Sequence, residues 1–421
     1  MLFKNGSLTL RSASGNQVKI AVAGDCCPEY ARRKADCTDF PQTYIQEGHG
    51  KDILESIQPV LDSADLRIIQ WETVVTDKNT PIVKAGPCLA VAPGTARFLT
   101  DGRFDIALLA NNHTGDHGPD EIIRTIDEIS KLGVKTVGAG KNAEDAKKPL
   151  HFEKNGLRFS LINGCEMEFG TARADKAGSN GYDEYEFREQ IAAERAAGYQ
   201  VIVIIHGGNE YNPIPSPLLK KRYRSFVDAG AALVVNIHTH CPQGIEVYHD
   251  VPIIYSTGNF FFPDYNFDPA DFWWSGYLPR ITFDASGVTG IEVFPYCFSP
   301  DPWKITLLSG AAREWFLSYL EKISSLMHTD GDRLYDVWTA YRSAMPLNWI
   351  RNAPAGKLVE DVEDPAALET LPGVRHMMTC QAHNELTKNT LLMIEEKRLL
   401  AAKEQIPELT ELRTARFFEK I

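Results

Sequence analysis

Five short apolar runs, each followed directly by polar residues, mark the first 240 positions of the chain. They are VKIAVAGD (18–25), ADLRIIQWE (64–72), FDIALLANNH (104–113), YQVIVIIHGGNEY (199–211) and AALVVNIHTH (231–240). Runs of this length that are rich in Val and Ile are typical of strands buried on both faces of a sheet. The pattern therefore predicts buried strands that end in polar side chains, and a later run at 251–265 predicts one more strand with a turn at Gly258.

Helical periodicity fills several of the gaps between these runs. In segment 118–133, apolar residues recur at spacings of four and three, and the segment stops at Gly133. Segments 183–198 and 217–230 have the same character and also stop at a glycine. This alternation of strand and helix predicts the α/β fold class, in which ligands bind beyond the carboxyl ends of the strands.

The pattern of apolar and polar residues changes after about residue 300. The remaining segments are long and amphipathic, which indicates helices, and glycine is absent after Gly373. We predict two parts, a catalytic α/β domain over residues 1–300 and a helical region over 301–421. The expected role of these helices is packing against the core or against a second copy of the chain, which makes them the candidate surface of a homo-oligomer. A catalytic role for them is the less favoured alternative.

Composition and charge narrow the class of protein. Hydrophobic residues make up 43% and charged residues 24% of the 421 positions, as in soluble globular proteins. The net charge of -12 gives no general affinity for nucleic acid, so no nucleic-acid partner is expected. No run approaches the roughly 20 apolar residues of a membrane helix, and no signal-peptide core begins the chain. We therefore expect a cytoplasmic protein without a transmembrane segment and leave peripheral membrane association open.

The polar residues at the ends of the predicted strands are of the types that bind metal ions. In chain order they are Asp25, Glu72, Asn112, His113, His206, His238 and His240. Neutral imidazoles with carboxylate and amide oxygens suit zinc, manganese and iron. Two ions about 3.5–4 Å apart would use nearly all of these residues and would drive hydrolysis of phosphate esters or amides. Each residue alone has an ordinary explanation as a cap, a turn or a surface group, but their shared edge favours a metal centre.

The motifs at these strand ends carry a resemblance to a known family. They read AGD, QWET, LLANNHTGDHG, VGAGKNAEDAKKP, HGGNEY, AGAALVVNIHTHCPQ and IYSTGNFFF, and they run from about Val18 to Phe262. In this order they resemble the CapA-type poly-gamma-glutamate capsule biosynthesis family, within the calcineurin-like metallophosphoesterase superfamily. The resemblance implies a four-layer α-β-β-α sandwich of two sheets flanked by helices.

The same resemblance implies roles for individual residues. The implied metal ligands are Asp25, Glu72, Asn112, His206, His238 and His240. Glu72 would bridge two divalent ions of manganese, iron or zinc, with Asp25 and His240 on the first ion and the other ligands on the second. His113 would face the substrate and protonate a leaving oxygen, and Asp116 would orient His113.

Further residues are candidates for binding the substrate. Asn111 and Glu210 adjoin the matched motif residues, and Arg173 and Lys176 lie in the polar segment 163–185, which we expect to form a loop over the site. A solvated loop is the alternative for that segment. Trp273 and Trp274 either wall the pocket or, as we favour, belong to the core.

The eight cysteines include one that stands at a motif position. No CxxC pair is present, which argues against zinc-ribbon and thioredoxin-like proteins, and we expect most of the thiols to be reduced and buried. Cys27 occupies the place where the superfamily usually has a histidine. It is either a soft third metal ligand or, as we favour, a small buried side chain.

Together these observations predict a dinuclear-metal-dependent hydrolase. The expected activity is that of a phosphoesterase in capsule or other surface-polymer biosynthesis, with cleavage of a gamma-glutamyl amide as a chemical variant. The expected partner is an anionic polymer or a phosphorylated small-molecule or lipid-linked substrate. The main alternative is a non-catalytic metal-binding component that holds or transfers polymer, and an amidohydrolase barrel with a His-x-His pair is the least favoured.

Overall fold

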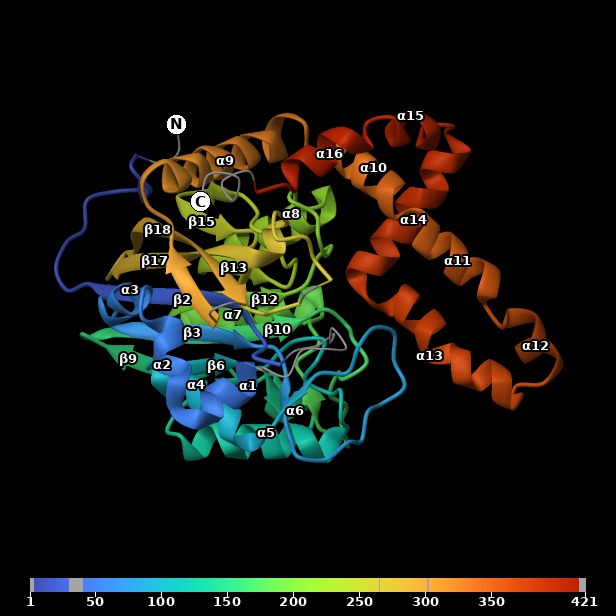
Figure 1. Cartoon of the computed structure of the whole chain (residues 1–421), viewed down its shortest axis with the longest axis horizontal. Coiled ribbons are helices and arrows are strands. Elements are labelled where there is room, and N and C mark those ends of the chain that lie inside the picture. Colours follow the sequence, from blue (N-terminus) through green and yellow to red (C-terminus); the bar gives the residue numbers. More distant parts are fainter. Residues whose placement is uncertain (1–3, 30–40, 265, 301–302, 416–421) are drawn as a thin grey trace.

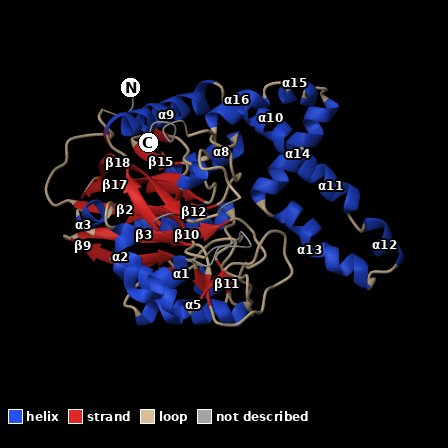
Figure 2. Cartoon of the chain, in the orientation of Figure 1, coloured by secondary structure: helices blue, strands red, loops and turns tan. Residues whose placement is uncertain are grey.

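The computed structural model describes residues 4–29, 41–264, 266–300 and 303–415. Two β-sheets lie face to face, helices cover their outer sides, and a further group of helices extends from one end (Figures 1 and 2). The predicted four-layer α-β-β-α sandwich with a C-terminal helical region is confirmed. Neither of the two large sheets closes into a barrel, so the amidohydrolase alternative is wrong for the described part of the chain.

The first sheet has nine strands. Its main order is β1 (Ser7–Thr9), β18 (Gly287–Pro300), β17 (Ser275–Asp284), β2 (Val18–Cys26), β3 (Leu66–Trp71), β6 (Ile106–Leu108) and β7 (Lys135–Val137). Two short strands join it, β16 (Asn259–Phe261) beside β2 and β19 (Trp303–Leu307) beside β18. Strands β2, β3, β6 and β7 are parallel, so their carboxyl ends lie at one edge.

The second sheet has six strands. Its order is β14 (Ile245–Tyr248), β15 (Val251–Ile254), β13 (Ala231–Ile237), β12 (Gln200–His206), β10 (Leu157–Cys165) and β9 (Leu150–Lys154). Strands β10, β12 and β13 are parallel, with Cys165 opposite His206 and His206 opposite Ile237. The carboxyl ends of these three strands therefore also lie side by side. Two small ribbons pair β8 (Ala139–Gly140) with β11 (Gly178–Ser179) and β4 (Val74–Val75) with β5 (Ala90–Val91).

Alternation of side chains along β2 divides the apolar core in two. Val18, Ile20 and Val22 belong to one buried cluster together with residues of the second sheet. Ala21 and Ala23, on the opposite face of the same strand, belong to a second cluster beneath the outer helices. Because β2 is buried on both faces, its sequence is almost continuously apolar, as the run at 18–25 predicted.

Helices of the two outer layers follow the strands. On the first sheet and its loops lie α1 (Pro41–Tyr44), α2 (Gly50–Leu54), α3 (Gln58–Asp62), α4 (Phe98–Asp101), α5 (Pro119–Lys131) and α6 (Ala143–Ala146). The second sheet is covered by α7 (Glu184–Ala196) and α8 (Pro217–Asp228). Asp183 and Ser216 cap the last two helices by accepting hydrogen bonds from backbone N–H groups of the first turn.

The C-terminal helices begin later than the sequence predicted. Residues 303–307 form β19, which extends the first sheet, and the helices start at Gly310 rather than at residue 301. They are α9 (Gly310–Thr329), α10 (Gly331–Arg342), α11 (Ala344–Asn352), α12 (Ala355–Glu360), α13 (Pro365–Thr379), α14 (Gln381–Glu395), α15 (Leu399–Lys403) and α16 (Ile406–Leu412). Helix α9 packs into the α/β core, whereas α10 to α14 (residues 331–395) project beyond it and are called the helical cap below.

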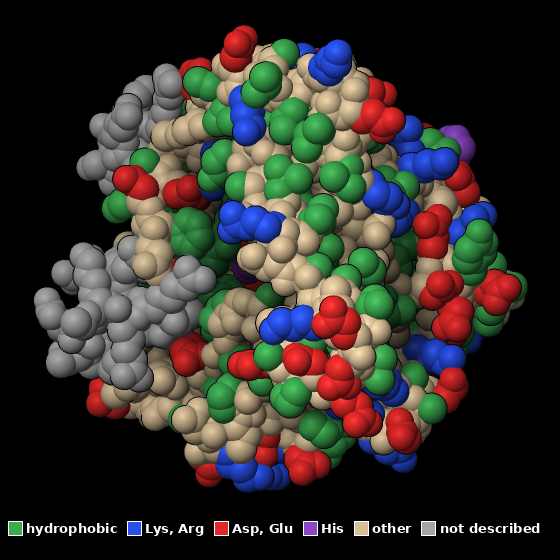
Figure 3. All heavy atoms as spheres, turned by 90° about the vertical axis from the view of Figure 1, so that its right-hand side faces the viewer, with side chains coloured by type: hydrophobic (Ala, Val, Ile, Leu, Met, Phe, Trp, Pro, Cys, Tyr) green, Lys and Arg blue, Asp and Glu red, His purple; other side chains and the backbone are tan. Residues whose placement is uncertain are grey.

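The helical cap carries most of the exposed large apolar side chains among the described residues. Figure 3 looks onto this side of the molecule, where apolar side chains lie among charged ones. Those of the cap are Tyr341, Ile350, Val359, Val362, Leu368, Leu371, Met378, Leu391, Leu392 and Ile394. Oligomerisation through these helices stays a prediction. In the described residues, no helix combines the length and the apolarity that crossing a bilayer requires.

Candidate metal centre

Two carboxylates form the base of the site. Asp25 lies near the end of β2, and Glu72 directly follows β3. Both side chains are fully buried, and Asp25 Oδ1 and both carboxylate oxygens of Glu72 lack hydrogen-bond donors. Burial raises the pKa of Asp25 and of Glu72 well above their usual values, and the charge of Glu72 raises that of Asp25 further. Unpaired buried carboxylates are costly, and a bound divalent cation would offset that cost.

Three imidazoles surround one oxygen of Glu72. His206 Nε2 lies 3.4 Å from Glu72 Oε1, His240 Nε2 lies 3.9 Å away and His113 Nε2 lies 4.0 Å away. Asp25 approaches two of the same rings, with 3.6 Å from Oδ1 to His206 Nδ1 and 3.6 Å from Oδ2 to His240 Nδ1. Glu72 thus has the central place that a bridging ligand requires.

The two rings of the His-x-His pair are positioned by a turn and not by a strand. Strand β13 ends at Ile237, and His238 and His240 have φ angles of 116° and 54°, in the left-handed region that non-glycine residues rarely adopt. The backbone N–H of His238 donates to Asp25 Oδ2 at 3.1 Å, which links the turn to β2. The backbone turns directly after β13, and this turn brings both rings over the carboxylates.

Asn112 and His206 complete the cluster. Asn112 Oδ1 lies 2.9 Å from His206 Nε2, and His206 Nδ1 is buried with no hydrogen-bond partner. Burial lowers the pKa of His206 well below its usual value, and the neighbouring histidines lower it further, so the ring is neutral and able to donate a lone pair. Two overlapping groups have donor atoms within 4.8 Å of one another: Asp25 with Glu72 and His206, and Glu72 with His238 and His240. All six residues predicted as ligands therefore lie together.

A glycine lets the first and last motifs meet behind the site. A Cβ atom on Gly24 would lie 1.9 Å from the carbonyl oxygen of Gly258, closer than any side chain permits. This contact brings β2 against the turn before β16, whose Asn259 accepts a hydrogen bond from His240 Nδ1 at 2.8 Å. The AGD and STGN motifs are therefore neighbours in space as well as parts of one resemblance.

His113 is held from behind by a carboxylate and an amine. Its Nδ1 lies 2.6 Å from Asp116 Oδ2, and Lys84 Nζ donates to Asp116 Oδ1 at 2.5 Å and to the carbonyl of Asn112 at 3.2 Å. Burial lowers the pKa of His113, the charge of Lys84 lowers it further, and Asp116 opposes both. With the Nδ1 proton directed to Asp116, Nε2 faces the centre. Lys84 was missed from the sequence, because a single lysine in a polar loop has no spacing signal.

Asn111 supports this turn and does not line the cavity. Its Nδ2 donates to the carbonyl of Trp71 at 2.9 Å, and its Oδ1 accepts from the backbone N–H of His113 at 3.0 Å. Both polar ends of the fully buried side chain are thereby used. The substrate-binding role expected for Asn111 is not the one that this geometry supports.

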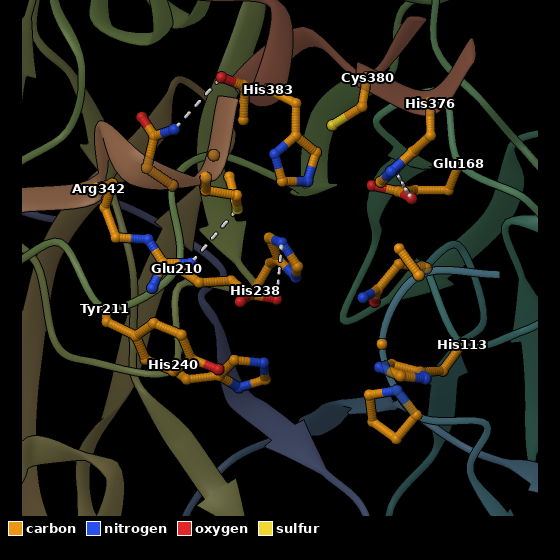
Figure 4. Close-up of a pocket in the computed structure, with 18 of the residues that line it drawn as sticks. His113, Glu168, Glu210, Tyr211, His238, His240, Arg342, His376, Cys380 and His383 are labelled. Atoms are coloured by element: carbon orange, nitrogen blue, oxygen red, sulfur yellow. Dashed lines mark hydrogen bonds and ion pairs between the residues drawn. The ribbon is translucent and has the colours of Figure 1, made fainter. Parts of the chain in front are cut away.

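The helical cap closes a cavity of about 360 Å³ above the cluster. Figure 4 shows His113, His238 and His240 on one side of it, with His376, Cys380 and His383 of the cap on the other. The cap residues that line the cavity are Trp338, Arg342, Met345, Trp349, His376, Cys380, Ala382, His383 and Leu386. The expectation that these helices only pack against the core or against a second subunit is too narrow, because they form the roof of the site. Their sequence is ordinarily amphipathic and carries no motif that predicts this.

The cationic groups of the cavity are not those that the sequence suggested. Arg173 and Lys176 face each other across an exposed turn and do not line the cavity, whereas Lys84 and Arg342 do. After β10 the chain turns Glu168 and Phe169 toward the cavity and carries residues 173–176 to the outer surface. The expected loop over the site therefore contributes its first residues and not its two cations.

Glu210 does lie in the cavity, where its Oε1 is 4.0 Å from His238 Nε2. Burial would raise the pKa of Glu210, but the charges of His238, His240 and Arg342 outweigh it and lower the pKa to about 2. An ionised carboxylate so close to the cluster is able to bind a cation or a positively charged part of a substrate.

An aromatic wall lies beside His240. Trp273 stacks on Phe267 at 4.0 Å between ring centroids, and Tyr211 lies 5.4 Å from Phe267. Trp273 lines the cavity although its side chain is almost fully buried, so both interpretations offered for it describe part of its environment. Trp274 belongs to the core cluster beneath the outer helices.

Cys27 lies in the same core cluster and is absent from the candidate ligand groups found among the described residues. Burial raises the pKa of its thiol well above the usual value, and Glu29 raises it further. The interpretation as a small buried side chain fits these surroundings. All described cysteines are free, most are buried, and Cys37 lies outside the described residues.

The two-sheet fold and its buried carboxylates and imidazoles place the chain among four-layer α/β proteins with a candidate metal centre. The chain belongs to the family of the bacterial capsule synthesis protein PGA_cap, whose family model matches residues 19–264. The resemblance of the motifs to the capsule biosynthesis family is thereby confirmed. The matched span holds every strand-end residue described above and stops short of the helical cap.

Curated relatives agree with this membership. The chain is 30% identical over 224 residues to the PGA biosynthesis protein CapA of Bacillus subtilis and 31% identical over 228 residues to the capsule biosynthesis protein CapA of Bacillus anthracis. These matches cover 52% of this chain and 59% and 56% of the two relatives. A probable polyglutamine synthesis accessory protein of Mycobacterium tuberculosis is 25% identical over 210 residues, which cover 47% of this chain and 55% of that protein. The chain thus matches little more than half the length of these relatives.

Two solved structures are similar at a lower level. A hypothetical protein of Thermus thermophilus covers 66% of this chain and 99% of its own with 15% identity and a TM-score of 0.40. The 5'-nucleotidase precursor of the same organism covers 74% of this chain and 60% of its own, with 13% identity and the same TM-score.

Proposed function

We propose that the chain is a dinuclear-metal-dependent hydrolase, and more specifically a phosphoesterase, that acts in the synthesis of a capsule or another surface polymer. One observation carries the proposal. Both carboxylate oxygens of Glu72 are buried without a hydrogen-bond donor, and Oε1 lies within 4.0 Å of three imidazoles. Electron-pair donors face one another at this point, and such an arrangement is stable when cations lie between them.

The residues present fit two divalent ions of manganese, iron or zinc. Asp25 and His240 would hold one ion, Asn112, His206 and His238 would hold the other, and Glu72 would join them. When bound, such a pair supplies Lewis acidity and lowers the pKa of water so that a nucleophile is available near neutral pH. The same chemistry applies to a phosphate ester and to a gamma-glutamyl amide.

His113 is the residue proposed to move a proton. With Nδ1 directed to Asp116, His113 Nε2 faces the cavity and is able to protonate a leaving oxygen. Asp116 fixes the ring orientation, and Lys84 holds Asp116 in place by an ion pair of 2.5 Å. His113 is therefore the proposed catalytic residue, whereas Asp116 and Lys84 are positioning residues.

The lining of the cavity supports an anionic substrate of limited size. Arg342 supplies positive charge, Glu168, Glu210 and Asp264 supply negative charge that bound cations would offset, and Tyr211, Phe267 and Trp273 supply an apolar wall. A volume of about 360 Å³ suits a phosphorylated end group or one or two residues of a polymer, so a longer polymer or lipid-linked substrate would place only its terminus inside.

Elemental analysis of the purified chain, compared with His238→Ala, tests the proposal. About two equivalents of manganese, iron or zinc per chain in the unmodified protein, with a clear decrease in the variant, are expected. The loaded protein is then assayed with phosphate monoesters, phosphate diesters and gamma-glutamyl peptides. Absence of metal both on purification and after reconstitution would rule the mechanism out.

A non-catalytic role in holding polymer is the second candidate. One observation favours it: the similar protein of Mycobacterium tuberculosis bears the name of an accessory protein. His113→Ala separates the two candidates. Retained metal with lost hydrolysis supports the enzyme, whereas metal-loaded protein that binds poly-gamma-glutamate and hydrolyses no substrate of the panel supports the binding component.

A further inference from the structure

A second group of metal-binding side chains lies in the roof of the cavity, outside the strand-end cluster. His376 comes from the last turn of α13, Cys380 lies at the break between α13 and α14, and His383 comes from the first turn of α14. One donor atom from each of these residues lies within 4.8 Å of the others. All three line the cavity and face it opposite His238 and His240 (Figure 4).

Two carboxylates of the core reach this group. Glu168 Oε2 lies 2.5 Å from His376 Nε2, and Glu166 Oε2 accepts hydrogen bonds from Cys380 Sγ at 3.2 Å and from the backbone N–H of Ala382 at 3.1 Å. Both glutamates closely follow β10, so the contacts join the α/β core to the helical cap. A carboxylate paired with a ligating imidazole is the usual outer arrangement of a zinc site.

Unused polar atoms remain in this cluster. His376 Nδ1 is buried and has no hydrogen-bond partner, and the same holds for Glu166 Oε1. The side chain of His376 is only 8% exposed, so water does not readily satisfy its second nitrogen. The ion pair with Glu168 accounts for Nε2 of His376 and not for its buried Nδ1. A histidine that served only that ion pair could leave Nδ1 exposed to water.

The donor set selects a particular class of cation. Two imidazoles and one thiol suit zinc and other borderline-soft divalent ions, and they are poor ligands for calcium or magnesium. Zinc binds nitrogen at about 2.0 Å and sulfur at about 2.3 Å, which places its donors about 3.5 Å apart. Donor atoms already within 4.8 Å of one another reach that geometry by small side-chain movements.

We propose that His376, Cys380 and His383 bind one zinc ion, separate from the strand-end centre, and that this ion ties the helical cap to the core over the cavity. Metal binding displaces the thiol proton of Cys380, for which Glu166 Oε2 is the adjacent acceptor. Three protein ligands leave one position of a tetrahedral ion for water, Glu166 or a substrate group. The site does not depend on the hydrolase proposal, because it shares no ligand with the strand-end centre.

Cobalt(II) titration of the full chain tests the site, because cobalt replaces zinc and bonds to thiolate with a charge-transfer absorption in the near ultraviolet. No proposed ligand of the strand-end centre contains sulfur, so this absorption reports only on a thiolate site. We expect the band to reach the intensity of one thiolate-bound ion per chain at saturating cobalt, equally in the unmodified chain and in His238→Ala. Added zinc should abolish it. Cobalt binding without any such band would overturn the proposal.

Substitutions then locate the sulfur. Cys380→Ser should remove the band and weaken binding by at least about tenfold, since even loss of an outer partner costs about 10–100-fold. Cys27→Ser is the matched control, because Cys27 is a buried thiol that lies in none of the candidate ligand groups of the described residues, and its band should persist. A band that survives Cys380→Ser, or that is lost in Cys27→Ser, contradicts the assignment. If Cys380→Ser fails to fold, His383→Gln is the replacement variant, because His383 is less buried. It should likewise weaken cobalt binding at this site.

Hydrogen exchange tests the tie between cap and core. In the His238→Ala background, one equivalent of zinc should slow amide exchange in α13 and α14 and leave exchange in α7 unchanged. The slowing should disappear in His238→Ala/His383→Gln. Unchanged exchange in α13 and α14 on zinc binding would overturn the linking role.

Discussion

Asn259 Oδ1 lies 2.8 Å from His240 Nδ1, and this contact decides which nitrogen of His240 faces the carboxylates. Asn259 Nδ2 donates to the carbonyl of Trp273 at 3.0 Å, so its oxygen is the atom that faces the imidazole. The proton of His240 therefore sits on Nδ1, and the lone pair of Nε2 points toward Glu72 Oε1, 3.9 Å away. Two electron-pair donors are held face to face, which is the arrangement that a bound cation stabilises.

Asn259→Ala should weaken metal binding although Asn259 does not itself contact the ions. Loss of the acceptor frees the His240 ring, and such outer partners are worth about 10–100-fold in metal affinity. Manganese affinity measured by calorimetry checks this. Asn259→Asp keeps an acceptor oxygen and should recover most of the affinity, which a purely structural role would not predict. Asn16→Ala, an exposed asparagine bonded to the carbonyl of Asn155, is the neutral control.

Gly24→Ala should destabilise the whole fold. The added Cβ would lie 1.9 Å from the carbonyl oxygen of Gly258, and both partners are backbone that cannot move aside cheaply. We expect a loss of more than about 4 kcal/mol in the free energy of unfolding, as for severe overpacking in a core. Urea unfolding followed by circular dichroism measures it. Gly373→Ala in α13 has open space around its Cβ and should be neutral or stabilising by up to about 1 kcal/mol. Equal stability of the two variants would contradict the close approach.

The strand-end cluster was predictable because its signals are local. Each ligand follows an apolar run that has to be a buried strand, and the carboxyl ends of parallel strands meet at one edge. Asp25, Glu72 and His206 therefore came together without any knowledge of side-chain geometry. The left-handed turn that aims His238 was not predictable, because the apolar run continues to the residue before it.

The roof of the cavity was not predictable, because its residues have no local signal in the sequence. Arg342 and His383 lie on helices whose sequence only requires an apolar face, and their approach to the site depends on how the helical cap docks. Lys84 likewise depends on the path of a polar loop. Arg173 lies outside the cavity for the same reason, since charge in a loop does not determine which way the loop turns.

Asp284→Asn should lower stability in a pH-dependent way. Asp284 accepts hydrogen bonds from Arg11 at 2.5 and 2.7 Å and from the backbone N–H of Ser14 at 3.0 Å. The hydrogen bond with Arg11 lowers the pKa of Asp284 below its usual value. A lowered folded pKa means stability that is present above the unfolded pKa of about 3.9 and is lost as pH falls through the folded pKa.

Because Arg11 is partly exposed, a loss of only about 1 kcal/mol is expected for Asp284→Asn at pH 7. The difference from the unmodified chain should shrink progressively below about pH 4. Thermal unfolding at several pH values measures both effects. Asp62→Asn, which removes an exposed pair with Arg103, should change stability by less than about 0.5 kcal/mol at any pH. A constant difference between Asp284→Asn and the unmodified chain down to about pH 2 would refute the linkage.

Arg342→Met should weaken the binding of an anionic substrate. The guanidinium group lies in the cavity wall, 5.8 Å above the ring of Tyr211, where part of its charge is shielded from water. A charge-assisted hydrogen bond there is worth about 1.5–3 kcal/mol, so we expect the KM for a phosphorylated substrate to rise by roughly 10-fold or more. Arg173→Met removes the same charge from the exposed turn and should leave KM unchanged. Steady-state kinetics measures both variants. A raised KM in Arg173→Met with an unchanged KM in Arg342→Met would place the anion site in segment 163–185 and would exclude the helical cap from substrate recognition.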